Sequence, residues 1–309
     1  MVRLMPGLSL VTLLLATVPV LLPAAFQADA ADIDHGRYLF DAAGCLGCHT
    51  DKENKGAPLA GGRRFETPFG VYYSPNITPD RMTGIGNWSM ADFLRALRYG
   101  ENPDGENYFP VFPYTSYTKM SDGDILDLKA YIFSLAPVRQ PNLEHEAGRV
   151  FGSRFMVGPW KVINFRAGPM KPVPDRGKKW NRGAYLVEAL GHCGECHTPR
   201  DRLGGTLEHQ HMAGTAKGPG GEAIPNITPD QETGIGKWPD ADLKALFSIG
   251  MLPDGDFVSG GMAENVSNTT GKWSKADAEA VIEYLKSLPP VINKIKKDKK
   301  KKTGTDEWN

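Results

Sequence analysis

Cysteine is scarce in this sequence, and a net charge is missing from it. The chain has 309 residues but four cysteines, which all lie in two short motifs, GCLGCHTDKE at 44–53 and GHCGECHTPR at 191–200. The 36 basic and 36 acidic side chains cancel, so no overall basic excess points to nucleic acid. The length suffices for two domains with separate hydrophobic cores.

Long hydrophobic runs are also missing, except at the N-terminus. There Arg3 precedes an apolar stretch from Leu8 to Leu22, and AFQADA follows, ending at Ala30. A charged start, an apolar centre and a small-residue site predict a signal peptide over residues 1–30. The apolar run is about 15 residues, shorter than the roughly 20 of a spanning helix, which disfavours an uncleaved membrane anchor. We expect export to the periplasm, as a soluble protein or one peripheral to the inner membrane.

The spacing of the cysteines, C-x-x-C-H in both motifs, limits their chemistry. A disulfide between cysteines three residues apart would close a tight ring and leave the two histidines unexplained. Zinc spacing is usually much shorter between pairs, and a thioredoxin-like pair needs a βαβ context, which is missing. C-x-x-C-H is instead the signature of covalent haem, in which two thiols of one helical turn bond the porphyrin and the histidine reaches the iron. The sequence predicts two haem c groups, held by Cys45, Cys48, His49, Cys193, Cys196 and His197.

Both motifs belong to an internal duplication. SPNITPDRMTGIGNWSMADF at 74–93 recurs as IPNITPDQETGIGKWPDADL at 224–243, and GRYLFDAAGCLGCHT at 36–50 matches GAYLVEALGHCGECHT at 183–198. The offset of about 150 residues indicates two whole domains rather than a solenoid. The predicted organisation is a signal peptide (1–30), a first domain (31–136), an interdomain linker (137–180), a second domain (181–290) and a lysine-rich tail (291–309).

Each repeat shows the same helical pattern. Apolar spacing and capping residues predict helices near 35–44, 89–99 and 122–135, and again near 182–191, 239–249 and 275–288. No convincing strand alternation is visible. The predicted fold class is all-α, with two tandem class I cytochrome c domains, and the aromatic linker is expected to pack across both.

The second axial ligand of each iron decides between electron transfer and catalysis, since a methionine sulfur favours electron transfer. In the second repeat the preferred candidate is Met262, in the loop before the last helix. The position aligned with it in the first repeat is Phe112, which cannot bind iron, so Met120 is preferred there. Alternatives for the second haem are Met251, Met212 and the pair His209 and His211; those for the first are Met82 and Met90.

Several other residues carry weaker signals. The carbonyl of Pro58 is a candidate acceptor for the Nδ1 hydrogen of the proximal histidine. Trp88 and Trp238 recur in both repeats, as pocket lining or as ordinary core. The N-x-[ST] triplets are interpreted as chance, with NIT a structural turn. Surface or packing roles are expected for His35, His145 and His192.

Several long blocks carry a family resemblance. ETPFGVYYSPNITPD, TGIGNW, ALRYGENPDG, FPYTSYTKMSD and WNRGAYLVEALGHCGECHTPR resemble the cytochrome c subunits of periplasmic alcohol and gluconate dehydrogenases, from about residue 33 to 290. The resemblance implies haem c and an electron-accepting role beside a dehydrogenase. It assigns Met120 to the haem of Cys45, Cys48 and His49, and Met262 to the other. Members commonly have three haem domains and this sequence has two, which disfavours direct quinone reduction.

The expected function is therefore a dihaem relay from an exported dehydrogenase to a quinone, another cytochrome or an oxidase. In this interpretation the chain is an electron-transfer subunit rather than a catalyst. The alternatives are a dihaem enzyme with an open iron site, peroxidase-like or thiosulfate-oxidising, and a haem sensor. The segment KIKKDKKKK at 294–302 holds seven lysines in nine positions, a solvated charge run or a contact for anionic membrane.

Overall fold

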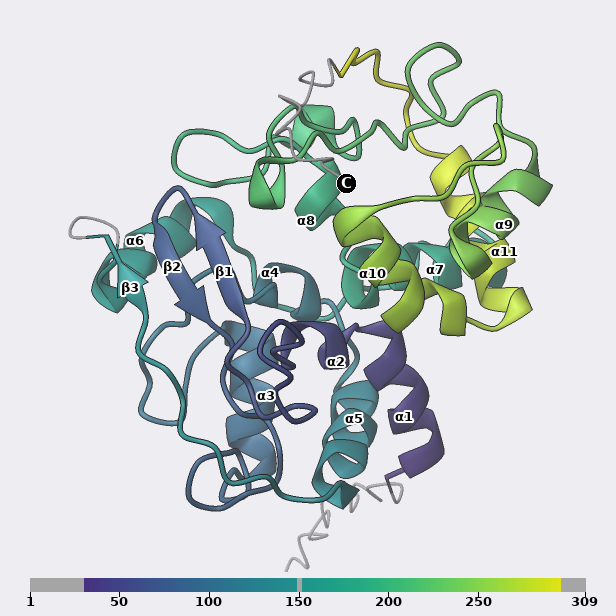
Figure 1. The fold of residues 1–309 in the computed structure, drawn as a ribbon. Coiled ribbons are helices and arrows are strands. Elements are labelled where there is room, and N and C mark those ends of the chain that lie inside the picture. Colours follow the sequence, from purple (N-terminus) through teal and green to yellow (C-terminus); the bar gives the residue numbers. More distant parts are fainter. Residues whose placement is uncertain (1–30, 149–151, 296–309) are drawn as a thin grey trace, which may run out of the picture. The chain divides into compact units, whose positions relative to one another are not determined.

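The computed structural model describes residues 31–148 and 152–295, which belong to one compact unit (Figure 1). The predicted signal peptide and the lysines from 296 onward lie outside the described residues. No helix in the described part of the chain is long and apolar enough to span a bilayer. The α-helices are α1 (Ile33–Ala42), α2 (Cys45–Cys48), α3 (Met90–Tyr99), α4 (Tyr114–Tyr117), α5 (Asp122–Ser134), α6 (Arg154–Asn164), α7 (Lys178–Tyr185), α8 (Gly194–His197), α9 (Asp240–Ile249), α10 (Gly260–Asn268) and α11 (Lys275–Lys286).

The predicted long helices are present in both repeats, and their ends follow the capping signals. The Ser89 and Ser121 side chains accept from the N–H three residues on, and Ser274 does the same at α11. α3 and α9 each end at a glycine in the left-handed region, Gly100 with φ 63° and Gly250 with φ 76°. These local hydrogen bonds explain why the boundaries could be predicted closely.

The first and last helices of each repeat cross at a glycine. α1 packs on α5, and α7 packs on α11. A Cβ on Gly36 would lie 2.1 Å from the Asp127 carbonyl oxygen, and a Cβ on Gly183 would lie 1.9 Å from that of Ala280. No side chain larger than hydrogen fits such an approach. The duplicated sequence thus repeats the helix crossing.

The prediction of an all-α protein is wrong in one region, because the mostly helical chain also has a three-stranded sheet. β1 (Arg64–Thr67) and β2 (Gly70–Tyr73) form an antiparallel hairpin, and β3 (Glu146–Ala147) pairs with β2. Strands this short show too little alternation for detection in a sequence. β3 belongs to the linker, so the linker completes a sheet of the first repeat.

The linker contacts both repeats, as predicted. The Lys161 ammonium donates to the Tyr99 carbonyl at 2.6 Å, and the Trp160 indole N–H donates to the Leu203 carbonyl at 2.9 Å. α6, which was not expected, carries both side chains. Buried apolar residues of the two repeats also belong to one core cluster.

The repeats exchange equivalent contacts with each other. Tyr38 of α1 donates to Asp277 of α11 at 2.6 Å. The equivalent residue of the second repeat, Tyr185 of α7, donates to Asp124 of α5. Each tyrosine hydroxyl also accepts from the N–H of the serine that caps the same helix. Because each tyrosine reaches the last helix of the other repeat, the two repeats are related by a reciprocal, pseudo-symmetric interface.

Candidate functional site

Each C-x-x-C-H motif forms one helical turn. In the first, the His49 N–H donates to the Cys45 carbonyl at 3.0 Å; in the second, the His197 N–H donates to the Cys193 carbonyl at 2.9 Å. The turn brings two thiols and one imidazole together, as the spacing predicted. All four cysteines are free and half-buried.

A proline carbonyl fixes each histidine ring. His49 Nδ1 lies 2.8 Å from the Pro75 oxygen, and His197 Nδ1 lies 2.9 Å from the Pro225 oxygen. A carbonyl only accepts, so Nδ1 carries the hydrogen and Nε2 keeps a lone pair for a metal. Burial lowers the pKa of both imidazoles, and the carbonyl bond offsets this only in part. The prediction of Pro58 as the acceptor is wrong, since the proline that reaches the ring is further along the chain.

The repeated NITPD segment holds these prolines in place. Asn226 is buried, and its Oδ1 accepts from the Thr228 N–H and hydroxyl at 2.9 and 2.8 Å. Its Nδ2 donates to the Val291 carbonyl at 2.7 Å. Asn76 makes the matching contacts in the first repeat. The interpretation of NIT as a structural turn is confirmed, and the turn presents the preceding carbonyl to the histidine.

The two preferred methionines occupy different settings. Met120 is fully buried between α4 and α5, and its N–H donates to the Tyr117 carbonyl at 3.0 Å. Met262 is half-buried in the first turn of α10, so its predicted loop is in fact a helix. That helix lacks a side-chain cap at Ser259 and starts with two glycines, so no local signal marks it. Coordination by these two sulfurs stays a prediction.

The structure argues against several alternative ligands. Met212, with φ 59°, is equivalent to Leu59, with φ 62°, and each carbonyl accepts from the isoleucine of the nearby PNI segment at 2.9 Å. Both repeats share this backbone bond, so the residue at this position helps to hold the PNI segment. His211 is bound to Glu188, and Met82 is 72% exposed.

Each motif turn is covered by the other repeat. The Glu195 carboxylate, inside the second motif, accepts from Thr115 Oγ1 at 2.7 Å and Ser116 Oγ at 3.0 Å, both on α4. A Cβ on Gly47, the equivalent residue of the first motif, would lie 3.0 Å from Asn268 Nδ2 on α10. The helix next to each preferred methionine therefore lies on the opposite motif.

An ion pair strengthens the second of these contacts. Arg63 donates to both carboxylate oxygens of Glu264 on α10, at 2.6 and 2.8 Å, and to the Gly47 carbonyl at 2.7 Å. Two parallel hydrogen bonds between guanidinium and carboxylate fix the relative orientation of the two groups and also add to the stability of the contact. α10, which carries Met262, is thus fixed to the first motif.

The two motifs lie beside each other. Burial raises the pKa of the Cys196 thiol to about 11, and the charges of Glu195 and Cys48 act in the same direction. Tyr117 donates to the Ala43 carbonyl at 2.7 Å, and its ring contacts the His192 ring with centroids 5.5 Å apart. His192, predicted as a surface or packing residue, packs between the repeats.

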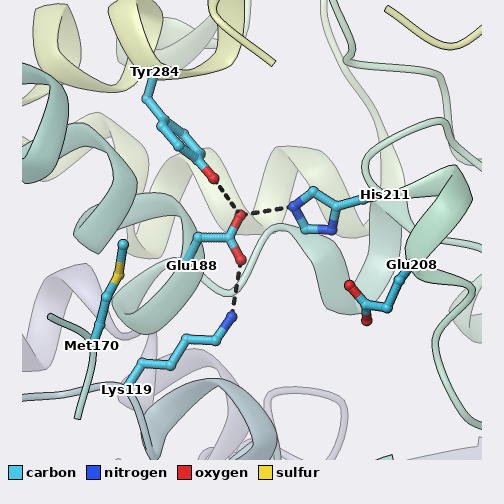
Figure 2. Close-up of a pocket in the computed structure, with 6 residues that line it drawn as sticks. All are labelled: Lys119, Met170, Glu188, Glu208, His211 and Tyr284. Atoms are coloured by element: carbon cyan, nitrogen blue, oxygen red, sulfur yellow. Dashed lines mark hydrogen bonds and ion pairs between the residues drawn. The ribbon is translucent and has the colours of Figure 1, made fainter. Parts of the chain in front are cut away.

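A carboxylate cluster lies near the second motif (Figure 2). Glu188 accepts from Lys119 Nζ at 2.9 Å, His211 Nε2 at 2.8 Å and Tyr284 Oη at 2.9 Å. Glu188 belongs to the π-helical turn Leu186–Leu190 that continues α7. These side chains line a cavity of about 370 Å³ together with Met170 and Glu208.

Burial alone would raise the pKa of Glu188, but the His211 hydrogen bond and the Lys119 charge lower it from 4.5 to about 2. The pKa of His211 is raised, because the bond to Glu188 outweighs its own burial. The first repeat has an equivalent carboxylate, Asp41, which pairs at 2.7 Å with Lys272 of the second repeat. The acid and lysine positions that recur in the two repeats were a signal for this cluster in the sequence, but the cluster was not predicted.

The residues present fit two haem c groups. Each motif offers paired thiols and an imidazole whose Nε2 is free, beside an apolar core. Within residues 31–148 and 152–295, no three His, Cys, Asp or Glu side chains gather as a metal site. Buried polar atoms without a protein partner also occur near the motifs, on Asn268 beside Gly47 and on Trp273 beside Gly191.

Comparisons with known proteins agree with this chemistry. Residues 33–136 match the family described as Cytochrome c. A diheme cytochrome c-type protein of Cereibacter sphaeroides is 38% identical over 273 residues, covering 87% of this chain and 90% of the relative. The fructose dehydrogenase cytochrome subunit of Gluconobacter japonicus is 37% identical, covering 86% and 54%. The gluconate 2-dehydrogenase cytochrome c subunit of Pantoea cypripedii is 36% identical, covering 91% and 65%.

The chain thus spans nearly all of the first relative, and about half to two thirds of the two dehydrogenase subunits. The cytochrome c match over residues 33–136 implies covalently bound haem c. Motif geometry and similarity together establish that this chain belongs to the c-type cytochromes, in the group that contains dihaem cytochromes c and the cytochrome subunits of sugar, gluconate and alcohol dehydrogenases.

Proposed function

We propose that this protein is a dihaem cytochrome c that passes electrons from an exported dehydrogenase to a downstream acceptor. The observation that carries the proposal is the duplicated site, in which both proximal histidines have the same bond to a proline carbonyl. Bound haem supplies a one-electron couple. The chain orients it through the thiols and the fixed imidazole, and burial of each site restricts access of water.

The assigned residues form two sets, which are equivalent in their thiols and histidines. Cys45, Cys48 and His49 hold one haem with Met120 as the second axial ligand; Cys193, Cys196 and His197 hold the other with Met262. Tyr117 contacts Ala43 and His192, the residues just before the two motifs, which supports a short path between the two sites. We propose that residues 31–136 and 181–290 are the two haem domains and that 137–180 join them.

The partners follow from the relatives. Those relatives are named as cytochrome subunits of dehydrogenases, which supports a dehydrogenase as the electron donor. We propose a quinone or another cytochrome as acceptor, and a periplasmic location after cleavage of residues 1–30. The lysines of 294–302 are proposed to contact anionic lipid.

The test is a spectroscopic one on the purified, exported protein. Haem per chain is counted, the far-red sulfur-to-iron band is recorded, and the reduced protein is titrated with carbon monoxide. Two low-spin haems that do not bind carbon monoxide are expected. A high-spin haem that binds it would overturn the relay in favour of an enzyme with an open iron site.

Substitutions assign the sulfurs. Met120→Leu and Met262→Leu are each expected to remove about half of the far-red band and to open one iron to carbon monoxide. Met212→Leu is the matched control, because its position is occupied by leucine in the first repeat. A loss of the band in Met212→Leu, with none in Met262→Leu, would refute the assignment of the second haem.

A further inference from the structure

The outer side of α6 is apolar and faces water. Phe155 is 80% exposed, Val162 73% and Ile163 70%. Pro159 follows Phe155 by four residues, Val162 follows Pro159 by three, and Ile163 comes next, a spacing that places all of them on one face of the helix. Met156 on α6 and Leu203 beside Trp160 extend this surface. Together they leave roughly 500 Å² of apolar surface in water, a size typical of interaction sites. We call these five exposed apolar residues, Phe155, Met156, Val162, Ile163 and Leu203, the α6 face.

The inner side of α6 is held firmly. Val157 is 5% exposed and packs with Tyr72 and Phe109 under the three-stranded sheet. Lys161 Nζ donates to the Tyr99 and Gly100 carbonyls at 2.6 and 3.0 Å. Figure 1 shows α6 at the periphery, next to β2 and β3. The helix is therefore positioned by its inner contacts, and no described residue covers the α6 face.

Basic side chains outnumber acidic ones around this face, where the acidic Asp201 accepts from the Leu203 N–H at 2.8 Å. Residues 152–174 contain four basic side chains and no acidic one. Arg154 is paired with Glu106 at 3.7 Å, but Arg166, Lys171 and the neighbouring Arg202 have no ion-pair partner among the described residues. Arg166 donates to the last carbonyls of α6, so its charge stays at the edge of the apolar stripe.

A single helix with a continuous apolar stripe and unpaired cations at its rim fits a lipid surface. Such a helix lies in the plane of the interface with its apolar side among the upper acyl chains, and cations attract anionic headgroups. The basic excess and the amphipathic pattern of a single exposed helix favour an anionic membrane over a protein partner.

We propose that the α6 face docks the protein on an anionic bilayer. This deepens the peripheral location proposed above, and it does not depend on the haem ligands or on the lysines from 296 onward. The linker thus has a role besides joining the repeats, since it presents Phe155, Val162 and Ile163 to lipid.

The test uses mature holoprotein and two kinds of vesicle, phosphatidylcholine alone and phosphatidylcholine with phosphatidylglycerol. Binding is expected to be stronger on the second and to weaken with salt. A triple substitution, Phe155→Ser with Val162→Ser and Ile163→Ser, is expected to lower the partition coefficient about tenfold or more on both. Arg166→Gln with Lys171→Gln should weaken binding several-fold on the anionic vesicles only.

The matched control substitutes three exposed apolar residues that lie elsewhere, Met82→Ser, Phe257→Ser and Ile292→Ser; their exposures are 72, 62 and 80%. Vesicle binding by this control should equal that of the natural chain. Equal losses in both triple variants, or no vesicle binding by the natural chain, would overturn the proposal. If the α6 variant keeps vesicle binding but loses reduction by a purified dehydrogenase, the face is a protein interface and the proposal fails.

A labelling experiment tests membrane insertion with a single substitution, so it decides the proposal even if the triple variant folds poorly. A nitroxide on Val162→Cys, in protein whose native cysteines hold haem, should become accessible to oxygen and inaccessible to a water-soluble relaxation agent when vesicles are added. An unchanged accessibility refutes insertion. Haem count and spectrum, measured on the same samples, show independently whether the proposed electron carrier is intact.

Discussion

Replacing the Glu188 carboxylate tests the cluster that joins the two repeats. Glu188→Gln keeps the shape of the side chain but turns one acceptor oxygen into a donor, so the hydrogen bonds from Lys119, His211 and Tyr284 cannot all persist. Lys119 belongs to the first repeat and Glu188 to the second. The substitution should therefore weaken the contact between repeats while leaving both haem motifs intact.

The magnitude follows from the pKa of Glu188. The folded environment lowers it from 4.5 to about 2, and one pKa unit corresponds to about 1.4 kcal/mol. The ionised carboxylate therefore contributes on the order of 3 kcal/mol to the free energy of unfolding. The bond from His211 is part of this same quantity and is not added to it.

The pH dependence has two limbs. Because the folded pKa of Glu188 is depressed, its contribution is present above pH 4.5 and is lost as pH falls towards about 2. Because the folded pKa of His211 is raised, its contribution is present below 6.5 and is lost as pH rises through the folded value. The cluster should therefore stabilise the protein most between about pH 4.5 and 6.5.

The assay is urea unfolding of the holoprotein at several pH values, followed by haem absorbance and tryptophan fluorescence. At pH 5.5 Glu188→Gln should lose about 3 kcal/mol, with a smaller loss at pH 8. Glu66→Gln, in an exposed pair with Arg64, is the control and should show no measurable change. A Glu188→Gln protein within about 0.5 kcal/mol of the natural chain at pH 5.5 would show that the ionised carboxylate does not stabilise the contact between the repeats.

Three further substitutions test the geometry by the same unfolding assay. Gly183→Ala should cost about 3 kcal/mol, since its Cβ would meet the Ala280 carbonyl at 1.9 Å; a neutral effect would mean that α7 and α11 are further apart. Asn226→Ala should cost about 3 kcal/mol by leaving buried backbone groups unpaired, and should perturb only the second haem spectrum; an unchanged spectrum contradicts its role behind the proline carbonyl. Arg63→Met should cost about 2 kcal/mol by leaving Glu264 with Lys52 alone, 3.8 Å away, a loss that Glu264→Met should not increase when combined with it; additive losses would contradict the pairing.

Much of the helical framework could be predicted, because its signals are local. Ser121 and Ser274 cap α5 and α11 as expected, and the repeat placed the same helices twice. α10 and α6 were missed for the opposite reason. α10 has no side-chain cap and rests against α2 of the other repeat, and α6 holds Pro159 and buries Val157 alone. Their stability comes from contacts that no short window of sequence contains.

The candidate site divides in the same way. The two motif turns could be predicted from spacing, since haem attachment needs two thiols and a histidine within one helical turn. The carbonyl acceptor could not, because Pro58 lies nearer to His49 in sequence whereas Pro75 lies nearer in space. Glu195 and Glu264 were missed because their partners belong to the opposite repeat.

The cover that each repeat places over the other's motif has a consequence for biogenesis. With Asn268 against Gly47, and Thr115 and Ser116 on Glu195, each motif turn is contacted by side chains of the other repeat. An enzyme that attaches haem meets these side chains only after the repeats have docked. We therefore expect attachment to be fastest on a chain whose repeats are still apart, so that the order of assembly matters for the yield of complete protein.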